Sequence, residues 1–456
     1  MTESNAPRLF GTNGIRGRVG DTLTAELALR IGASAGTFWK RGTVAIGTDC
    51  RESGLMLSMA LASGLNSAGL DVTDLGIVPT PALQYHVRTR GLAGGIVVTA
   101  SHNPPEFNGL KCVSPDGTEM SRTEEEEIER IHFAGKFIQA DWQGIGQLVH
   151  DEAANASYID GVAAAIAPNK PVGIDVVVDC GNGASGFTTP RALRSIGCRL
   201  QTINAQPDGS FPGRPSEPTE ENLSELIALC KSGGFDLGAA HDGDADRVVF
   251  VDEKGGFVSG DAELGLMAQL ACRRTKRGKV VVPIDTSRAV QEAVEGEGGE
   301  LIYTKVGSPG IARKMREISS VLGGEANGGI IFPQFQYCRD GLFAAAFLAR
   351  ELAEGGEPLS KLVSRLPKRQ MRRWKLPCPF ERFEEVLAKL QKEYPDAKRF
   401  DGLLVESKDH WVLFRPSGTE PILRLTVESK SDSALSGLFE KYSGSLKAAV
   451  EGARGR

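Results

Sequence analysis

Short apolar runs rich in β-branched residues recur along the chain, each followed by a small polar loop and then by a helical pattern. Runs that are apolar at successive positions are typical of strands covered on both faces. Strands that alternate with helices predict α/β units with largely parallel sheets. The order recurs at Thr43–Ile46 with Gly47–Ser53, at Ile174–Val178 with Asp179–Gly186 and Pro190–Ile196, and at Val280–Ile284 with Asp285–Ser287 and Arg288–Val294. The three copies differ too much to be called a sequence repeat.

The last part of the chain has another pattern. Pro367–Pro379 is rich in proline and basic residues and is interpreted as a linker. An amphipathic helix is predicted over Phe383–Tyr394, strands over Trp411–Phe414 and Ile422–Val427, and a helix at the chain end. The predicted fold class is therefore α/β, with three similar α/β domains and a smaller C-terminal α+β domain. The expected limits are 1–150, 151–253, 254–366 and 367–456.

The composition is that of an ordinary soluble globular protein. Of 456 residues, 41% are hydrophobic and 24% are charged, and the formal net charge of -5 argues against a nucleic-acid partner. No apolar run approaches a membrane span, no secretory signal is recognisable, and the eight cysteines form no CxxC pair. We expect reduced thiols, no membrane partner and a cytoplasmic location. Since no HExxH is present, a zinc hydrolase has little support.

The first loop that could carry chemistry is Thr99–Pro105, directly after the apolar run Gly95–Val98. Ligands of open α/β sheets bind at such strand ends. Ser101 is a candidate nucleophile, and His102 adjoins it. No GxSxG elbow surrounds Ser101, which argues against a Ser-His-Asp hydrolase. The alternative is a plain Asn-Pro turn.

The second loop carries three acids, Asp242, Asp244 and Asp246, between two apolar runs. Carboxylates this close repel one another unless a cation compensates, and oxygen ligands suit Mg²⁺ or Ca²⁺. An EF-hand is rejected because Arg247 stands where that loop needs glycine, although Glu253 falls at its twelfth position. A solvated acidic turn is the alternative, but such apolar flanks would leave it poorly solvated.

Three further loops are weaker signals. Arg415–Pro421, with Arg424 beyond it, offers many donors in a tight turn and suits a phosphate. Glu325 and Asn327 lie between glycines and could hold sugar hydroxyls, and Arg16 lies in the glycine-rich stretch Phe10–Gly17. For each, an ordinary Pro/Gly connection is the alternative. A GxGxxG at Gly181–Gly186 lacks a convincing acid about 20 residues on, so a nicotinamide site has little support.

Taken together, these loops resemble the α-D-phosphohexomutase superfamily. The match covers nearly the whole chain in order, through FGTNGIRG, TASHNPPEFNGLK, DGDADR, GEANGG and RPSGTEP. The resemblance implies four domains around a central cleft, with one functional loop from each domain. GEANGGIIFP and FGTNGIRG look most like the archaeal branch, which includes phosphoglucosamine mutases and phosphomannomutase/phosphoglucomutases.

The resemblance assigns roles to individual positions. It implies that Ser101 carries a phosphoryl group whose oxygen joins three carboxylates around one Mg²⁺, those of Asp242, Asp244 and Asp246. Arg247 is expected beside the phosphoserine, and acid/base or charge-stabilising roles fall to Lys111, Arg16 and His102. Glu325 and Asn327 match the sugar-hydroxyl pair. The binder of the non-reacting phosphate matches Arg415, Ser417, Gly418, Thr419 and Arg424.

Two departures affect the third domain. Many members carry GExSGH, whereas here Asn327 replaces the serine and Gly329 the histidine, so an acid/base role of that histidine is absent. The run ending in Ser308 stands where relatives often read KVGD. Substrate contacts from this domain are therefore the hardest to carry over.

The expected activity is a mutase that interconverts hexose or hexosamine 6-phosphate and 1-phosphate through a phosphoserine. A hexose 1,6-bisphosphate is both the intermediate and an activator, and Lys111 is a proton carrier if Arg16 lowers its pKa. Glucosamine phosphate is favoured, and phosphomannomutase/phosphoglucomutase is the alternative. A metal-dependent phosphatase, a nicotinamide oxidoreductase and a non-catalytic calcium-binding module are more distant rivals. The expected partner is a small phosphosugar, and the chain is expected to be a monomer or homodimer.

Overall fold

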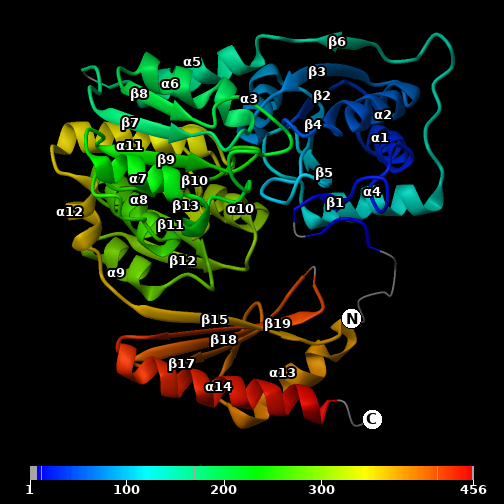
Figure 1. Cartoon of the computed structure of the whole chain (residues 1–456). Helices are drawn as coiled ribbons and strands as arrows, with labels where there is room; N and C mark the ends of the chain where they lie inside the picture. The colour runs from blue at the N-terminus through cyan, green and yellow to red at the C-terminus, as the bar shows by residue number, and fades with distance from the viewer. Residues whose placement is uncertain (1–7, 12, 169, 419, 454–456) are drawn as a thin grey trace.

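The computed structural model describes residues 8–11, 13–168, 170–418 and 420–453, which form four sheets with their helices (Figure 1). The first sheet has the strand order β1-β5-β4-β2-β3-β6. Its strands are β1 (Ile15–Arg18), β2 (Thr43–Thr48), β3 (Asp71–Ile77), β4 (Gly94–Val98), β5 (Phe107–Val113) and β6 (Leu148–His150). Its helices are α1 (Ala25–Trp39), α2 (Gly54–Ser67), α3 (Thr80–Arg90) and α4 (Arg122–Ala134).

The second sheet has the order β10-β9-β7-β8 and the third the order β12-β11-β13-β14. The second is built from β7 (Asp175–Asp179), β8 (Arg199–Ile203), β9 (Leu237–His241) and β10 (Val248–Val251), with α5 (Ala154–Ile166), α6 (Thr189–Ser195) and α7 (Ser224–Ser232). The third is built from β11 (Lys279–Pro283), β12 (Glu300–Thr304), β13 (Leu322–Glu325) and β14 (Gly329–Ile331). Its helices are α8 (Gly260–Thr275), α9 (Arg288–Gly296), α10 (Ser308–Ile318), α11 (Gly341–Gly355) and α12 (Leu359–Ser364).

The three sheets share one four-stranded unit. In each, a central strand is parallel to two neighbours, and the second neighbour turns back into an antiparallel partner. The hairpins are β4–β5, β9–β10 and β13–β14, and their turns carry Ser101, the three acids and the sugar loop respectively. The sequence copies are therefore copies of one topology, and the sheets are parallel except at these hairpins and at β1, which pairs with β5 in the antiparallel direction.

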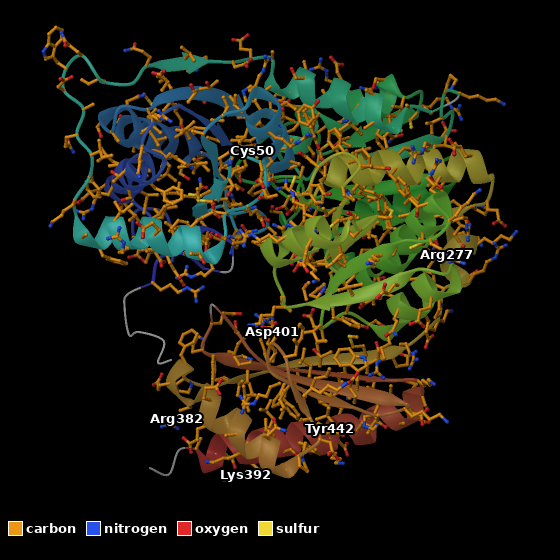
Figure 2. The ribbon with its side chains drawn as sticks, turned by 180° about the vertical axis from the view of Figure 1, so that it is seen from behind. Cys50, Arg277, Arg382, Lys392, Asp401 and Tyr442 are labelled. Atoms are coloured by element: carbon orange, nitrogen blue, oxygen red, sulfur yellow. The ribbon has the colours of Figure 1, made fainter. Side chains whose placement is uncertain are left out.

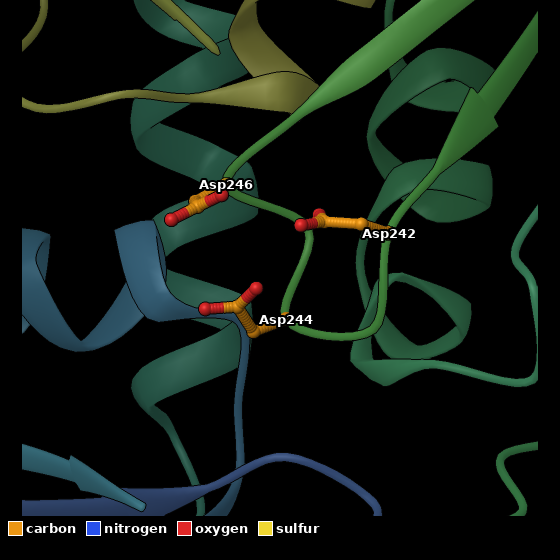
Figure 3. Close-up of side chains that lie close together, drawn as sticks. All are labelled: Asp242, Asp244 and Asp246. Atoms are coloured by element: carbon orange, nitrogen blue, oxygen red, sulfur yellow. The ribbon is translucent and has the colours of Figure 1, made fainter. Parts of the chain in front are cut away.

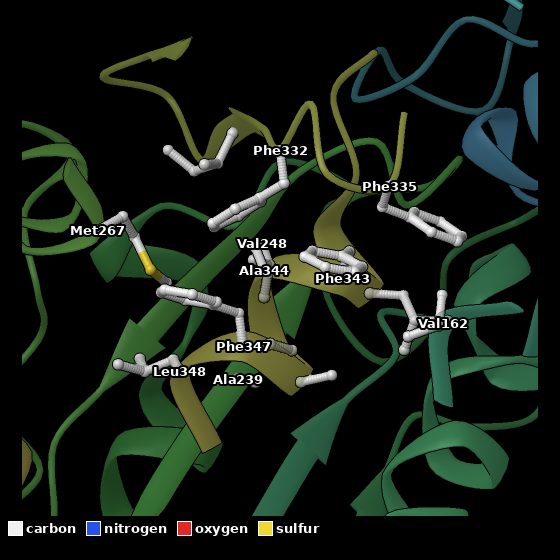
Figure 4. Close-up of a cluster of buried hydrophobic side chains, with 14 of the residues drawn as sticks. Val162, Ala239, Val248, Met267, Phe332, Phe335, Phe343, Ala344, Phe347 and Leu348 are labelled. Carbon is white, nitrogen blue, oxygen red and sulfur yellow. The ribbon is translucent and has the colours of Figure 1, made fainter. Parts of the chain in front are cut away.

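A buried aromatic cluster joins the second and third units (Figure 4). Phe332 lies after β14, and its ring is 4.7 Å from that of Phe347 on α11. Phe343, also on α11, stacks on Phe335 at 5.0 Å. Aromatic pairs at such distances add to the large apolar area that they bury. The start of α11 is thereby held firmly beside β9 and β10.

The C-terminal domain is a five-stranded sheet of order β15-β19-β18-β17-β16 with two long helices packed on it. Its elements are β15 (Gln370–Pro377), α13 (Phe383–Glu393), β16 (Lys398–Arg399), β17 (Leu403–Glu406), β18 (His410–Pro416), β19 (Ile422–Ser429) and α14 (Asp432–Gly452). In Figure 1 this sheet lies apart from the other three, with the turn between β18 and β19 projecting toward them.

The interpretation of Pro367–Pro379 as a linker is wrong, because Gln370–Pro377 is strand β15 and pairs with β19 along its whole length. Half-buried Trp374 and Leu376 pack on the core of the C-terminal domain, and half-buried Met371 packs on the other face beside Trp411 and Leu413, so apolar positions on both faces are hidden in a basic composition. The strand lies at the sheet edge, where proline is tolerated.

Several contacts fasten the C-terminal domain to the third one, among them a backbone hydrogen bond and an ion pair. The Val306 amide donates to Asp401 Oδ2 at 3.0 Å, and Figure 2 shows Asp401 on the side of the C-terminal domain that faces the rest of the chain. Arg288 forms an ion pair with Glu406 at 2.8 Å. A cavity of about 730 Å³ lies beside that pair and is lined by both domains. Among the described residues, no helix has the length and apolar character that crossing a bilayer requires.

Candidate active site

Ser101 and the acidic loop meet although they come from different sheets. Ser101 lies in the β4–β5 turn, is fully buried, and donates from Oγ to Asp242 Oδ2 at 2.9 Å. Its φ of 54° places it in the left-handed region, which is uncommon for a residue other than glycine. Such strained backbone is found mostly at functional sites. The turn thus presents the Ser101 hydroxyl to the acids.

Arg51 fixes the backbone of the Ser101 loop. Its guanidinium is buried, pairs with Asp49 at 3.0 Å, and donates to four carbonyl oxygens, those of Ser101, Asn103, Pro104 and Phe107. One planar group with five N–H donors can satisfy such a set, whereas a lysine cannot. The loop conformation therefore depends on a residue some fifty positions earlier in the chain.

The three acids form a compact, buried group on the β9–β10 turn. Figure 3 shows Asp242, Asp244 and Asp246 pointing into a shared space, and one oxygen from each lies within 4.8 Å of the others. All are at most 1% exposed, and Asp244 Oδ1 and Asp246 Oδ1 have no hydrogen-bond partner among the described residues. Orphaned buried carboxylate oxygens are costly unless a cation binds them. The donor set fits a hard divalent cation such as Mg²⁺.

The electrostatics within this group favour the binding of a cation. Burial, together with the neighbouring Asp244 and Asp246, raises the pKa of Asp242 to about 8. Burial opposes ionisation of Asp246 as well, but the cations Arg339 and Lys111 outweigh it and lower the pKa of Asp246. Two carboxylates are thus held ionised and the third is forced toward protonation, which a divalent cation would reverse.

Gly243 lets the two loops approach. A Cβ at this position would lie 2.7 Å from the Ser101 carbonyl oxygen and 2.8 Å from Ser216 Oγ, so only glycine fits. Ser216 itself donates to that carbonyl at 3.1 Å. Arg214 holds the other side by donating to the His241 carbonyl at 2.6 Å and pairing with Asp179.

Lys111 is placed among the acids. It lies on β5, is 2% exposed, and donates from Nζ to Asp244 at 2.6 Å and to Asp246 at 3.1 Å. Arg16 acts to lower the pKa of Lys111, as expected, but the net shift is in the other direction. Burial disfavours the ammonium, but Asp244 and Asp246 more than offset it, and the pKa of Lys111 is raised.

His102 and Arg16 lie beside Ser101. His102 Nδ1 is 3.3 Å from Ser101 Oγ, and burial, with Arg247 and Arg16 nearby, lowers the pKa of His102 to about 3. The imidazole is therefore neutral near pH 7. Arg16, on β1, donates to Asn103 Oδ1 at 2.8 Å. Arg247 Nε is 3.9 Å from Asp242 and 3.7 Å from Asp246.

The sugar loop is close to the same cluster. Glu325 ends β13 and is 3.7 Å from Arg339, which itself pairs with Asp246 at 2.7 Å. Burial raises the pKa of Glu325, and Arg339 opposes that shift. Asn327 accepts the Gly329 amide at 3.1 Å, so its side-chain oxygen is used within its own turn.

The predicted phosphate loop lies on the C-terminal domain, in the β18–β19 turn. Arg415 and Arg424 are cross-strand partners, so both side chains are on the same face of the sheet. Arg424 forms an ion pair with Glu420 at 2.6 Å, Ser417 is buried, and Gly418 is exposed. Thr419 lies outside the described residues. Two adjacent arginines with a tight turn suit a phosphate dianion.

Several residues that shape the site have no motif of their own. Thr80, at the first turn of α3, donates to Asp244 at 2.6 Å, and Glu119 accepts from Arg339 at 3.2 Å. The sequence offers for Arg51 only its place in the polar loop after the first apolar run, near Asp49, which does not assign it a role. Glu253, which falls at the twelfth position of the rejected EF-hand pattern, accepts a hydrogen bond from the Ser360 amide at 3.1 Å and so has another role.

Comparison with known proteins finds matches in every part of this architecture. Residues 7–139, 156–256 and 259–370 match the phosphoglucomutase/phosphomannomutase alpha/beta/alpha domains I, II and III. Residues 375–443 match the C-terminal domain of the same family.

Relatives of similar length are also found. A Methanopyrus kandleri protein named "Probable phosphoglucosamine mutase" is 43% identical over 451 residues, which are 98% of this chain and 99% of that protein. A Thermococcus kodakarensis "Phosphoglucomutase/phosphomannomutase" is 40% identical over 440 residues, or 93% and 95% of the two chains. The crystal structure of a phosphoglucomutase/phosphomannomutase family protein from Burkholderia thailandensis superimposes with a TM-score of 0.87 and 31% identity over 97% of both chains.

Proposed function

The chain belongs to the phosphoglucomutase/phosphomannomutase family, and from this premise we propose that it interconverts glucosamine 6-phosphate and glucosamine 1-phosphate. Ser101 is the proposed phosphoryl carrier. The observation that carries the proposal is the 2.9 Å contact between Ser101 Oγ and Asp242, within a buried group of three acids. A phosphoryl group on that oxygen would be next to the cation that the acids require.

Asp242, Asp244 and Asp246 are the proposed ligands of one Mg²⁺. When bound, the ion supplies Lewis-acid charge to the phosphoryl oxygens on Ser101. Since phosphoryl transfer passes through a loose and highly charged transition state, positioning and charge dominate catalysis. Arg247 and Arg16 add positive charge at the same place.

The proposed reaction is two reciprocal transfers. In the first, the free hydroxyl of the sugar phosphate forms a bond to phosphorus as the bond to Ser101 Oγ breaks, and the hydroxyl proton passes to a basic group. His102, neutral and 3.3 Å from Ser101 Oγ, can hydrogen-bond at the reacting oxygen, and Lys111 can neutralise developing charge. The resulting 1,6-bisphosphate reverses its orientation in the site and returns its other phosphoryl group to Ser101.

Both transfers require that the non-reacting phosphate is bound at the same site. Arg415 and Arg424, with the turn at Ser417 and Gly418, are proposed to hold whichever phosphate is distant from Ser101. Thr419 is proposed to assist. A single site for that phosphate lets one reacting centre serve both ends of the sugar.

The choice of sugar rests on the relatives. The protein with 43% identity bears the phosphoglucosamine mutase name, and a relative with 40% identity bears the phosphoglucomutase/phosphomannomutase name, which is the second candidate. Glu325 is the proposed acceptor for sugar hydroxyl groups, with Asn327 beside it. We also propose domain limits near residues 150, 253 and 367.

A coupled assay tests the proposal. The 6-phosphates of glucosamine, glucose and mannose are compared with Mg²⁺ present and a trace of hexose 1,6-bisphosphate as primer. We expect the highest kcat/KM with glucosamine 6-phosphate and no steady release of inorganic phosphate. A preference for mannose or glucose phosphate would select the second candidate. Steady phosphate release without isomerisation would replace the mutase by a phosphatase.

A further inference from the structure

We infer that Arg339 is a positioning residue that fastens the sugar loop to the acidic loop and so sets where the sugar lies relative to the phosphoryl group on Ser101. The inference deepens the proposed function and rests on it. Arg339 is not part of a recognised motif, and it lies far along the chain from the three acids of the acidic loop. Its importance comes from what surrounds it in space.

Arg339 is buried among three carboxylates from three different domains. Its side chain is 5% exposed. Nη2 is 2.7 Å from Asp246 and 3.2 Å from Glu119, and Nη1 is 3.7 Å from Glu325. A planar guanidinium can face three carboxylates at fixed angles, whereas the ammonium of a lysine is a single point charge. One side chain therefore sets the relative positions of an acid-loop ligand and the sugar-loop carboxylate.

The backbone that carries Arg339 is rigidly mounted. Arg339 forms a bridge with Ile331 beside β14, and the next residue, Asp340, caps α11 by accepting the Phe343 amide at 2.9 Å. Asp340 also accepts from buried Tyr158 at 2.5 Å. Because α11 is packed in the aromatic cluster, the guanidinium is presented from a fixed point.

Gly329 makes room for the arm of Arg339. A Cβ at Gly329 would lie 2.5 Å from Arg339 Cδ and 3.2 Å from its Cγ. The φ of Gly329 is not among the positive values, so the backbone itself does not need glycine there. A glycine is needed at position 329 because the side chain of Arg339 crosses it. Many members of the resembled superfamily carry a histidine at this position, whereas here the side chain of Arg339 passes over Gly329.

Glu119 explains the second departure of the third domain. Its Oε1 accepts from Arg339 and from Asn13 at 2.9 Å, and its Oε2 accepts from the hydroxyl of Ser308. Ser308 stands where relatives often have aspartate. An aspartate there would put two carboxylates together, and like charges at this distance repel. The serine donates instead, so Gly329 and Ser308 both fit one Arg339–Glu119 pair.

The first test separates positioning from general stability. Arg339→Lys keeps the positive charge but loses the planar guanidinium. We expect KM for glucosamine 6-phosphate to rise and kcat to fall, so that kcat/KM is lower by about tenfold to a hundredfold. Arg316→Lys is the matched control, because Arg316 also joins the third domain to the first, through Asp116, but on the exposed surface. Unchanged kcat and KM in Arg339→Lys would overturn the inference.

A second variant leaves every charge in place. Gly329→Ala should displace the arm of Arg339 and reproduce the loss seen in Arg339→Lys, while Gly310→Ala, where a Cβ meets no atom within 4 Å, should match wild type. If Gly329→Ala has wild-type kcat and KM, the arm does not depend on that space and the inference fails.

A binding measurement needs no turnover. Glucosamine 6-phosphate is titrated calorimetrically into Ser101→Ala and into Ser101→Ala combined with Arg339→Lys, and we expect about tenfold weaker binding in the second. Equal affinity overturns the inference even if the wild type is a mutase. If the wild type isomerises no hexose phosphate but Arg339→Lys still weakens binding, the proposed function fails and only the part of the inference that concerns sugar binding stands.

Discussion

At the scale of single residues, buried charge is what distinguishes this protein from an ordinary α/β chain. Lys111, Arg51 and Arg339 are each at most 5% exposed, and all are paired with carboxylates. A buried ion pair contributes little to net stability, but the loss of one partner is costly. Such groups are therefore best explained by the positions they impose on their neighbours.

Glu263 is the exception and permits a prediction about stability. It lies in the first turns of α8, is 1% exposed, and neither carboxylate oxygen has a partner among the described residues. Burial raises the pKa of Glu263 well above its usual range. The folded state thus binds the Glu263 proton more tightly than the unfolded state, so stability is full below the unfolded pKa and falls as pH rises toward the folded one.

We expect Glu263→Gln to flatten that dependence. At pH 7 the variant should be more stable than wild type by about 1–3 kcal/mol, and the difference should vanish near pH 4. Urea unfolding at a series of pH values measures it, with exposed Glu451→Gln as the control. A variant less stable than wild type at pH 7 would mean that Glu263 has a partner when folded.

At the scale of elements, the site is made by three equivalent hairpins. The turns of β4–β5 and β9–β10 come together because Gly243 has no side chain to separate them. The left-handed residues Ser101 and Ala245 turn the two loops sharply at the place of contact. Strands from separate sheets thus supply one reacting centre.

Gly243→Ala should separate the loops while leaving both sheets intact. A shift of about 1 Å between a nucleophile and its catalytic groups can cost about a hundredfold in rate, and we expect kcat to fall by about that factor. The melting temperature should change little, because no core contact is lost. Gly437→Ala, where a Cβ meets nothing within 4 Å, is the matched control. Wild-type kcat in Gly243→Ala would show that the two loops need not touch.

Comparison of the predicted with the observed elements shows which strands and site residues the sequence could predict. Ile422–Val427 was predicted as a strand and lies in β19, and the loops with Ser101 and Asp242 could be found because small polar residues follow buried strands. The strand β15 was missed because the exposed basic residues between its few apolar ones resemble a linker. Arg51 and Arg339 could not be assigned, since their partners are 50 and 93 positions away and only folding brings them together.

At the scale of the whole molecule, the proposed phosphate loop belongs to a domain separate from the reacting centre. The C-terminal sheet is fastened to the third domain through Asp401 and the Arg288–Glu406 pair, with a cavity beside that pair. The interface also contains a small apolar cluster of Ile284, Leu404, Trp411 and Leu413. An interface that is not large and hydrophobic permits relative domain motion. A substrate held at both ends would draw the two parts together.

We therefore expect a phosphosugar to make the protein more compact. In solution X-ray scattering with Mg²⁺, hexose 1,6-bisphosphate should decrease the radius of gyration of the wild type. Arg415→Ala should abolish that decrease and raise KM much more than it lowers kcat, because the grip is lost but the reacting centre is intact. The same decrease in both proteins would mean that Arg415 does not bind the phosphate.

The most direct test of the account is the fate of the Ser101 hydroxyl. The protein is incubated with hexose 1,6-bisphosphate carrying labelled phosphoryl groups, and the adduct is located by mass spectrometry of peptides. We predict one phosphoryl group on Ser101 that is transferred to glucosamine 6-phosphate when that sugar and Mg²⁺ are added, and none in Ser101→Ala. Turnover with no adduct on Ser101, or an adduct that stays on the protein while the sugar is isomerised, would contradict the account.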